Sequence, residues 1–285
     1  MSTDDTPDSP FRHEQTARDE APQYVLPLVV HIEKTEPPAR TDALETAARA
    51  VLVMLADERS LGEGEWAEAV RDWQDARIRK VVRRARGAEW RKASALPGIT
   101  VTGGGSVTGR VTVTGGGSGA ADAAGAADAA GAADETTDAP EGSKDAATAA
   151  EVRVFPPVPL DGWPKELAKL QVSGTDLDDP EPPAAADLSA PVLWLNPDLG
   201  MSAGKAMAQA GHGAQLAWWE LSEEERAQWR DAGFPLSVRT PAADRWRELT
   251  TSGLPVVRDA GFTEIAPGSC TVVADHPALR LARHV

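Results

Sequence analysis

The chain has 285 residues and a formal net charge of −15, a length that suits one large domain or two small ones. Its single cysteine, Cys270, excludes an intramolecular disulfide framework, and no apolar run reaches the length of about 18 residues that a membrane-spanning helix needs. The first 20 residues are acidic and polar, unlike a signal peptide, so we expect a cytoplasmic protein.

Most of the net negative charge comes from three segments that we expect to be disordered or flexible. These are a charged tail at 1–22, a Gly- and Ala-rich insert at 102–148, and a linker at 172–189 that is rich in proline and aspartate. Their acidic parts carry net charges of −4, −5 and −5, counted over residues 1–20, 102–150 and 172–187. The rest of the chain is close to neutral, so the acidity does not exclude a nucleic-acid partner.

The first half alternates strand and helix patterns once the insert is set aside. Apolar runs predict strands at 24–34, 78–85 and 151–159, and longer amphipathic patterns predict helices at 41–58 and 65–77.

The second half repeats this alternation in the order βα(α)βαββ. Strands are expected at 191–196, 235–240, 254–259 and 269–275, and helices at 202–219, 222–229 and 241–252. Ser222 and Glu225 form a capping-box pattern at the start of the second of these helices. The pattern predicts a compact α/β domain with a mixed sheet.

The two halves also resemble each other in sequence. "AEWRKASALPGITV" (88–101) aligns with "DRWRELTTSGLPVV" (244–257) after a two-residue gap, and "EVRVFPPVP" then takes the place of "SCTVVADHP". The insert 102–148 falls where the second half has the loop "RDAGFTEIAPG". We therefore predict two copies of one α/β unit.

The first motif is "GMSAGKAMAQAGHGAQLAWW" (200–219), which covers the helix expected at 202–219 and the two residues before it. Lys205, Gln209 and His212 follow the spacing i, i+4, i+7 and share one face of the helix. Gly211 and Gly213 each cost about 1 kcal/mol relative to alanine, so we interpret them as allowing close approach of another backbone or a ligand. The alternative is a half-exposed helix with ordinary polar residues.

The second motif is the loop "RDAGFTEIAPGSCTVV", in which Asp259 ends an apolar strand and precedes a glycine. Strand ends and the loops after them are where α/β sheets present reactive side chains. Thr263, Ser269 and Thr271 are further candidates in or next to the loop. The alternative is a turn-forming aspartate with hydroxyl groups that cap nearby backbone.

Together the two motifs resemble the peptidyl-tRNA hydrolases of the archaeal and eukaryotic type (type II). The match rests on "LGMSAGKAMAQAGHGA" and "LPVVRDAGFTEIAPGSCTVVADHP" and covers about 190–278. It implies a mixed four-stranded sheet flanked by helices and hydrolysis of the ester bond between a peptide and tRNA. With the internal similarity, we expect a bacterial two-copy member, with a degenerate hydrolase-like domain at 23–171 and a catalytic domain at 190–285.

The resemblance also assigns roles to residues of the two motifs. It implies catalytic roles for Lys205, Asp259 and Thr263, and substrate-binding roles for Gln209, His212, Ser269 and Thr271. Asp259 would activate a water molecule, and Lys205 would stabilise the developing negative charge. Ala203 stands where the family has a lysine, and Asn196 with Pro197 where it has a basic residue; these departures affect phosphate binding more than the chemistry.

The first copy lacks these side chains, and we expect it to be catalytically silent. Asp42, Thr46 and Arg49 stand in the places of Lys205, Gln209 and His212. The stretch 77–92 carries eight basic residues, which could follow a phosphate backbone or simply protect a strand edge.

The remaining expectations concern partners. No metal or cofactor is predicted, because the histidines lack the spacing of a metal site. We expect peptidyl-tRNA as the partner, no membrane, and a monomer in which the two copies form an intramolecular pseudo-dimer. The competing hypothesis is a non-catalytic family member that binds RNA or another protein.

Overall fold

The computed structural model describes residues 22–104, 113–115, 148–261 and 264–281. The expected tail, most of the expected insert, and Thr263 lie outside these ranges. Across the described ranges, no helix is both long and apolar enough to cross a membrane.

The first lobe, residues 22–171, holds one sheet and five helices among its described residues. In chain order the elements are β1 (Tyr24–His31), α2 (Arg40–Ala56), the short 3-10 helix η1 (Glu58–Ser60), α3 (Ala67–Asp75), β2 (Arg79–Ala85), α4 (Gly87–Ser94), β3 (Ile99–Thr102), β4 (Val113–Gly115), β5 (Glu151–Val154), β6 (Val158–Pro159) and α5 (Lys165–Ala168). Residues 25–30 of β1 are buried on both faces, as expected for a central strand covered by helices on each side.

The second lobe, residues 190–281, holds a second sheet. Its elements are β7 (Val192–Leu195), α6 (Ala203–Glu220), α7 (Glu223–Asp231), β8 (Ser237–Arg239), α8 (Ala243–Thr251), β9 (Val256–Arg258), β10 (Cys270–Asp275) and α9 (Pro277–Leu281). Ser222 and Glu225 form the predicted capping box at the start of α7. The predicted α/β class, with mixed sheets flanked by helices, is confirmed.

The two sheets have the same strand order and directions at their centres. In the second lobe the order is β8-β7-β10-β9, with β7 parallel to β8 and antiparallel to β10, and β10 antiparallel to β9. In the first lobe β2-β1-β5-β3 repeats this order with the same relative directions. The first sheet extends further than the four strands that we expected, because β4 pairs with β3 and β6 pairs with β1. Since β4 lies inside 102–148, the expectation of a wholly disordered insert was wrong for Val113–Gly115.

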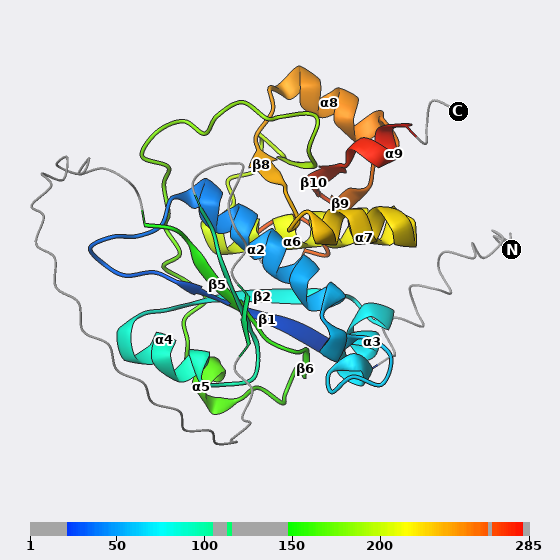
Figure 1. The fold of residues 1–285 in the computed structure, drawn as a ribbon. Helices are drawn as coiled ribbons and strands as arrows, with labels where there is room; N and C mark the ends of the chain where they lie inside the picture. The colour runs from blue at the N-terminus through cyan, green and yellow to red at the C-terminus, as the bar shows by residue number, and fades with distance from the viewer. Residues whose placement is uncertain (1–21, 105–112, 116–147, 262–263, 282–285) are drawn as a thin grey trace, which may run out of the picture.

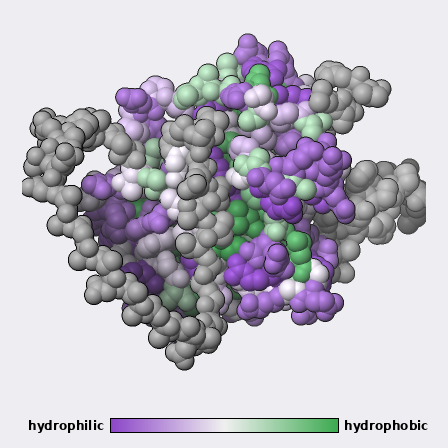
Figure 2. Space-filling view, in the orientation of Figure 1, coloured by the Kyte–Doolittle hydropathy of each residue, from purple (hydrophilic) through white to green (hydrophobic). Residues whose placement is uncertain are grey.

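Helices α2 and α6 join the lobes. Figure 1 shows them side by side between the two sheets, α2 in blue and α6 in yellow, and the contacts agree: α2 packs on β3 and β5, α6 packs on β9 and β10, and the helices pack on each other. One hydrophobic core runs through both lobes. Both helices are buried on nearly every side, which explains why they are rich in alanine and short of polar residues. On the face in Figure 2, hydrophilic residues cover the outer parts and a hydrophobic area lies near the middle.

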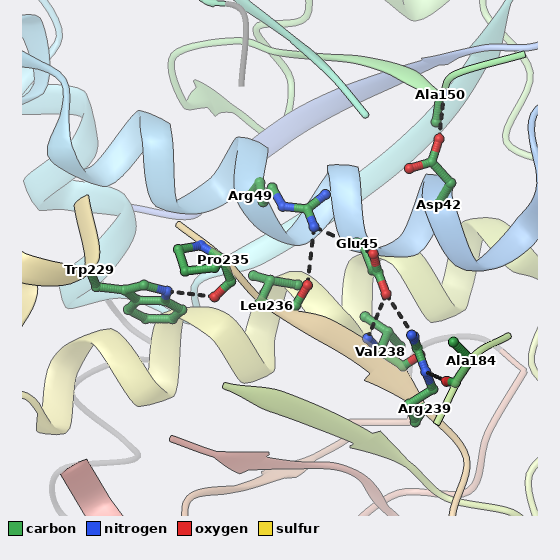
Figure 3. Close-up of polar contacts among 10 residues, drawn as sticks. All are labelled: Asp42, Glu45, Arg49, Ala150, Ala184, Trp229, Pro235, Leu236, Val238 and Arg239. Carbon is green, nitrogen blue, oxygen red and sulfur yellow. Dashed lines mark hydrogen bonds and ion pairs between the residues drawn. The ribbon is translucent and has the colours of Figure 1, made fainter. Parts of the chain in front are cut away.

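Polar contacts also cross between the lobes, from α2 to β8 (Figure 3). The Glu45 Oε1 atom accepts from the Val238 backbone N–H at 3.1 Å and from Arg239 Nη1 at 2.7 Å. The Arg49 guanidinium donates to the Leu236 carbonyl at 3.1 Å. The edge strand β8 therefore has one of its backbone groups paired by the other lobe.

The linker 172–189 contains no helix or strand, yet it packs against the starts of both central helices. Thr175 and Leu177 are buried, and Thr175 Oγ1 accepts from the Gly204 backbone N–H at 3.0 Å. Asp179 accepts from the backbone N–H and the hydroxyl of Thr41, at 2.8 and 2.7 Å, which places a carboxylate at the positive end of α2. The expectation that this acidic segment is disordered was therefore wrong. The side chains of Thr175 and Asp179 accept hydrogen bonds from backbone N–H groups in the first turns of α6 and α2, which have no acceptor within the helix.

The glycines of α6 make room for protein side chains. A Cβ atom at Gly213 would lie 2.7 Å from Val272 Cγ1 of β10, and one at Gly211 would lie 2.9 Å from Val51 Cγ2 of α2. Our interpretation of close approach is correct, but the neighbours are the sheet on one side and the other lobe on the other, so these two glycines require no ligand.

We expect Gly213→Ala to destabilise the protein by up to about 2 kcal/mol. Overpacking a core costs about 1 to 3 kcal/mol, and the better helix propensity of alanine returns about 1 kcal/mol. Urea unfolding followed by circular dichroism measures the difference. Gly200→Ala is the matched control, because nothing lies within 4 Å of a Cβ atom there. Equal stability of the two variants would contradict the packing role.

Candidate active site

Asp259 follows β9 at the edge of the sheet where the parallel strands β7, β8 and β9 end. Its backbone N–H donates to the Ser269 carbonyl at 2.9 Å, and its carbonyl accepts from the Gly268 N–H at 2.7 Å. These bonds continue the pairing of β9 with β10 by one residue and fix the direction of the side chain. The side chain is buried, with 6% of its surface exposed.

Three donors surround the Asp259 carboxylate. Lys205 Nζ lies 2.6 Å and Gln209 Nε2 lies 2.7 Å from Oδ2, and the Gly261 backbone N–H donates to Oδ1 at 2.8 Å. Gly261 has φ of +79°, and a Cβ atom there would lie 2.3 Å from Pro267, so the turn that supplies this N–H requires glycine. The i, i+4 spacing of Lys205 and Gln209 thus brings both side chains onto one carboxylate, as the helix periodicity predicted.

Thr271 lies behind Gln209. The Thr271 hydroxyl donates to Gln209 Oε1 at 2.6 Å, and its side chain is fully buried in β10. A donor at Oε1 leaves the Gln209 NH₂ group to face Asp259, so Thr271 sets the orientation of the amide.

The start of α6 is bound to the loop that follows Asp259. The Ser202 hydroxyl accepts from the Lys205 backbone N–H at 3.3 Å, as an N-cap, and donates to Glu264 at 2.9 Å. Glu264 also accepts from the Ser202 backbone N–H at 3.1 Å. Separation of the start of α6, which carries Lys205, from the loop after Asp259 would break both Ser202–Glu264 hydrogen bonds.

The other predicted site residues lie at different distances from this cluster. Ser269 is adjacent through its carbonyl, which binds the Asp259 backbone. His212 is not in contact with Asp259; its Nδ1 atom lies 3.1 Å from Lys80 Nζ of the first lobe. Burial and the positive charges of Lys80 and Lys205 hold the pKa of His212 well below its usual range, so its imidazole is neutral at pH 7. Thr263 is outside the described residues.

The corresponding place in the first lobe holds different groups. The Gly103 N–H donates to the Ala150 carbonyl at 2.7 Å, as the Asp259 N–H donates to Ser269, so Gly103 stands where the second lobe has its aspartate. A Cβ atom at Gly103 would lie 2.4 Å from Asp42 Oδ1 and 2.5 Å from Thr46 Oγ1. Asp42 also accepts from the Ala150 N–H at 2.7 Å (Figure 3), and burial raises the pKa of its carboxyl group. Asp42 and Thr46 therefore occupy the space that a side chain at 103 would need.

The basic stretch 77–92 is largely used within the fold. Arg83 donates to the carbonyls of Ala168 and Leu170, and Arg84 donates to the Ser173 carbonyl. Lys80 is 8% exposed and points between the lobes. These contacts join β2 to the segment that follows α5 and favour the structural alternative for the stretch over a phosphate-binding track.

A cavity of about 510 Å³ lies between the lobes at the same sheet edge as the site. The start of α2, the linker and the ends of β7 and β8 line it, with Arg40, Pro183, Trp194 and Arg239 among the lining residues. Within the part of the chain that the structure describes, no group of three or more histidine, cysteine, aspartate or glutamate residues could hold a metal ion.

Sequence reasoning gave no site role to Lys80 and Thr175, which lie outside the two motifs, or to Glu264, which lies within the second motif. Ser202 carried a local signal, because a serine directly before the first residue of a helix, here three residues before Lys205, is a common N-cap. Thr175 and Lys80 are far from the site in sequence and lacked such a signal, since only the packing of the linker and of the first lobe brings them to α6.

Comparison with known proteins assigns a family to the second lobe. The family model described as "Peptidyl-tRNA hydrolase PTH2" matches residues 190–281. A protein of Aeropyrum pernix named "Peptidyl-tRNA hydrolase" is 37% identical over 95 residues, which cover 28% of this chain and 77% of that protein. A protein of Thermococcus onnurineus with the same name is 35% identical over 98 residues, which cover 30% of this chain and 82% of that protein. "Peptidyl-tRNA hydrolase 2, mitochondrial" of Bos taurus is 36% identical over 96 residues, covering 30% and 54%.

Proposed function

The chain belongs to the peptidyl-tRNA hydrolase PTH2 family, and we propose that its second lobe hydrolyses the ester bond of peptidyl-tRNA and releases the peptide and free tRNA. The family match and the relatives identify an enzyme of the peptidyl-tRNA hydrolase type. The observation that carries the proposal is the contact of Lys205 and Gln209 with the buried carboxylate of Asp259, at the edge of the sheet where three parallel strands end.

In the proposed reaction, Asp259 acts on the water molecule through Oδ1. A carboxylate offers about four acceptor positions, two on each oxygen. Lys205 and Gln209 both donate to Oδ2, whereas Oδ1 accepts the Gly261 N–H among the described residues and can accept one more bond. A water bound there would lose its proton toward Asp259 as it attacks the ester carbonyl carbon.

Lys205 supplies positive charge for the oxyanion that forms when water attacks. It lies in the first turn of α6, where the positive end of the helix dipole also favours an anion. A fixed cation and a helix terminus need little reorganisation as the charge develops, which is the main source of such stabilisation.

The remaining residues are assigned by their positions. We propose that Gln209 and Thr271 orient the Asp259 carboxylate, since the Thr271 hydroxyl holds the Gln209 amide. Ser269, next to Asp259, and His212, on the same helix face as Lys205, are proposed to contact the substrate. Thr263 keeps the catalytic role that the family resemblance implies.

We further propose that the first lobe is a copy of the same unit without the catalytic pair. The shared strand order, the equivalent backbone bonds of Gly103 and Asp259, and Asp42 in the place of Lys205 support this proposal. In this division the chain has a tail at 1–22, a silent domain at 23–171, a linker at 172–189 and a catalytic domain at 190–285, which together form a pseudo-dimer within one monomer.

The test is release of peptide from a peptidyl-tRNA of defined sequence by the purified full-length chain. We expect labelled peptide and intact tRNA as products, with aminoacyl-tRNA as the control substrate for general esterase activity. Binding of peptidyl-tRNA without any release would overturn the proposal and favour the non-catalytic RNA-binding alternative.

A further inference from the structure

Lys80 is a buried lysine that crosses from the first lobe to the helix of the proposed active site. It lies on β2, and its Nζ atom is 3.1 Å from His212 Nδ1, 2.5 Å from Gln215 Oε1 and 3.3 Å from the Ile78 carbonyl oxygen. The same atom lies 4.8 Å from the centre of the Trp73 ring. Three acceptors thus surround a group that has three N–H donors when it is protonated.

Gly211 leaves room for the Lys80 side chain on the surface of α6. A Cβ atom at Gly211 would lie 3.2 Å from Lys80 Cδ and 3.5 Å from Cε, so glycine leaves the space that the lysine stem fills. The three nearest atoms to that position all belong to Val51 and Lys80, so Gly211 faces the first lobe. This contact explains a helix-interior glycine that the chemistry of Asp259 does not require.

With Lys80 protonated, its contact determines which nitrogen of His212 carries the imidazole proton. An ammonium group can only donate, so Nδ1 is then the acceptor, and a neutral imidazole has its proton on Nε2. Burial holds the pKa of Lys80 well below its usual range, whereas Gln215 Oε1, the Ile78 carbonyl oxygen and the face of the Trp73 ring are groups that stabilise an ammonium. His212 is neutral in either case, because its pKa lies well below the usual range.

We propose that Lys80 is a positioning residue through which the first lobe holds His212 as the Nε2–H tautomer, so that Nε2–H can donate to an oxygen atom of the bound substrate. His212 is half-buried and follows Lys205 and Gln209 on one helix face, which directs it to the side of α6 that carries the site. The role for substrate rests on the proposed function, whereas the tautomer does not. The silent lobe would thereby contribute to the site of the other lobe.

The test starts with the tautomer of His212 in the full-length chain. Long-range proton–nitrogen correlation spectra of protein labelled with ¹⁵N at histidine distinguish Nδ1–H, Nε2–H and imidazolium forms, and His212→Asn assigns the signal. We expect one neutral Nε2–H form from pH 6 to 8. A proton on Nδ1, or a mixture of tautomers, in the unaltered protein would overturn the proposal without any variant having to fold.

The second part compares Lys80→Met with Arg49→Met. Methionine keeps the length of the stem and removes the donors, and Arg49 is another first-lobe cation that bonds to the second lobe, through the Leu236 carbonyl, away from His212. We expect Lys80→Met to give mixed tautomers and to raise KM for peptidyl-tRNA by roughly three- to tenfold, the scale of one hydrogen bond, with kcat nearly unchanged. Arg49→Met should change neither the tautomer nor KM. Lys80→Arg, which restores a donor, should bring KM most of the way back to the value of the unaltered protein.

The outcomes separate the two proposals. A single unchanged tautomer in folded Lys80→Met would show that Lys80 does not position His212. A mixed tautomer without any change in KM would show that the tautomer does not serve substrate binding. Absence of hydrolysis by the unaltered chain would reject the proposed function and leave the tautomer result standing.

Discussion

Asp259→Asn should lower kcat for peptidyl-tRNA hydrolysis by a factor of about one hundred or more while the chain remains folded. Asparagine has nearly the same size as aspartate, but its amide cannot take a proton from water. An asparagine that keeps its oxygen at the position of Oδ2, where Lys205 and Gln209 donate at 2.6 and 2.7 Å, would turn its NH₂ group toward the Gly261 N–H, which is also a donor. The variant therefore removes the proposed base and leaves two donors facing each other.

The same substitution should reduce the free energy of unfolding by about 3 kcal/mol. Lys205 and Asp259 are 13% and 6% exposed, so the pair is largely desolvated, and removing one partner of a buried pair is costly. A protein of this size that starts with ordinary stability should tolerate this loss at 25 °C. Steady-state kinetics must accordingly be measured well below the midpoint of thermal unfolding of the variant.

Asp275→Asn is the matched control for this loss of stability. Asp275 is a second buried aspartate of the same sheet, bound by Arg280 at 2.5 Å and by the Trp194 indole N–H at 3.0 Å, and it has no contact with Asp259. We expect this variant to lose stability and to keep kcat within about twofold. Asp259→Asn with full turnover would exclude the assigned base, and equal loss of kcat in both variants would show that instability, not chemistry, lowers the rate.

Most of the second lobe could be predicted because its local signals agree with its final packing. The capping box at Ser222, the alternation of strands and helices, and the apolar strand before Asp259 all act within a few residues. In the first lobe, β4 was missed because a three-residue strand in Gly-rich sequence carries little periodic signal. The strand predicted at 151–159 is divided in the structure into β5 and the two-residue β6. The packed linker was missed for another reason: its polar and proline-rich composition resembles that of disordered chains, and its order depends on helix ends that it meets from far away.

The contacts of the candidate site also fall into those that local sequence predicts and those that depend on distant packing. Helix spacing places Lys205 and Gln209 on one face, and the strand end places Asp259, so their contact follows from local geometry. The contact of His212 with Lys80 does not follow from local geometry, since Lys80 lies 132 residues away in the other lobe. Gly211 and Gly213 were interpreted as possible ligand contacts because a sequence shows that a side chain is absent but not what fills the space.

A fragment of residues 188–285 should not remain a soluble monomer. In the full chain α6 is buried against its own sheet on one side and against α2 and β2 of the first lobe on the other. Removal of the first lobe exposes the second side, where Ala- and Met-rich surface would meet water. It also removes Glu45, the acceptor of the Val238 backbone N–H, and so opens the edge strand β8.

The full-length chain should behave differently because its first lobe already covers both surfaces. We expect light scattering to give the mass of a monomer, about 30.0 kDa, for the full chain and a dimer or larger species for the fragment. A folded lobe can cover an apolar helix with shape and apolar area alone, so the packing of α2 on α6 does not require a lysine and an aspartate in the first lobe, where Asp42 and Gly103 stand. A dimeric full-length chain together with a monomeric, soluble fragment would contradict the pseudo-dimer, and the hydrolytic role of Asp259 would not depend on that result.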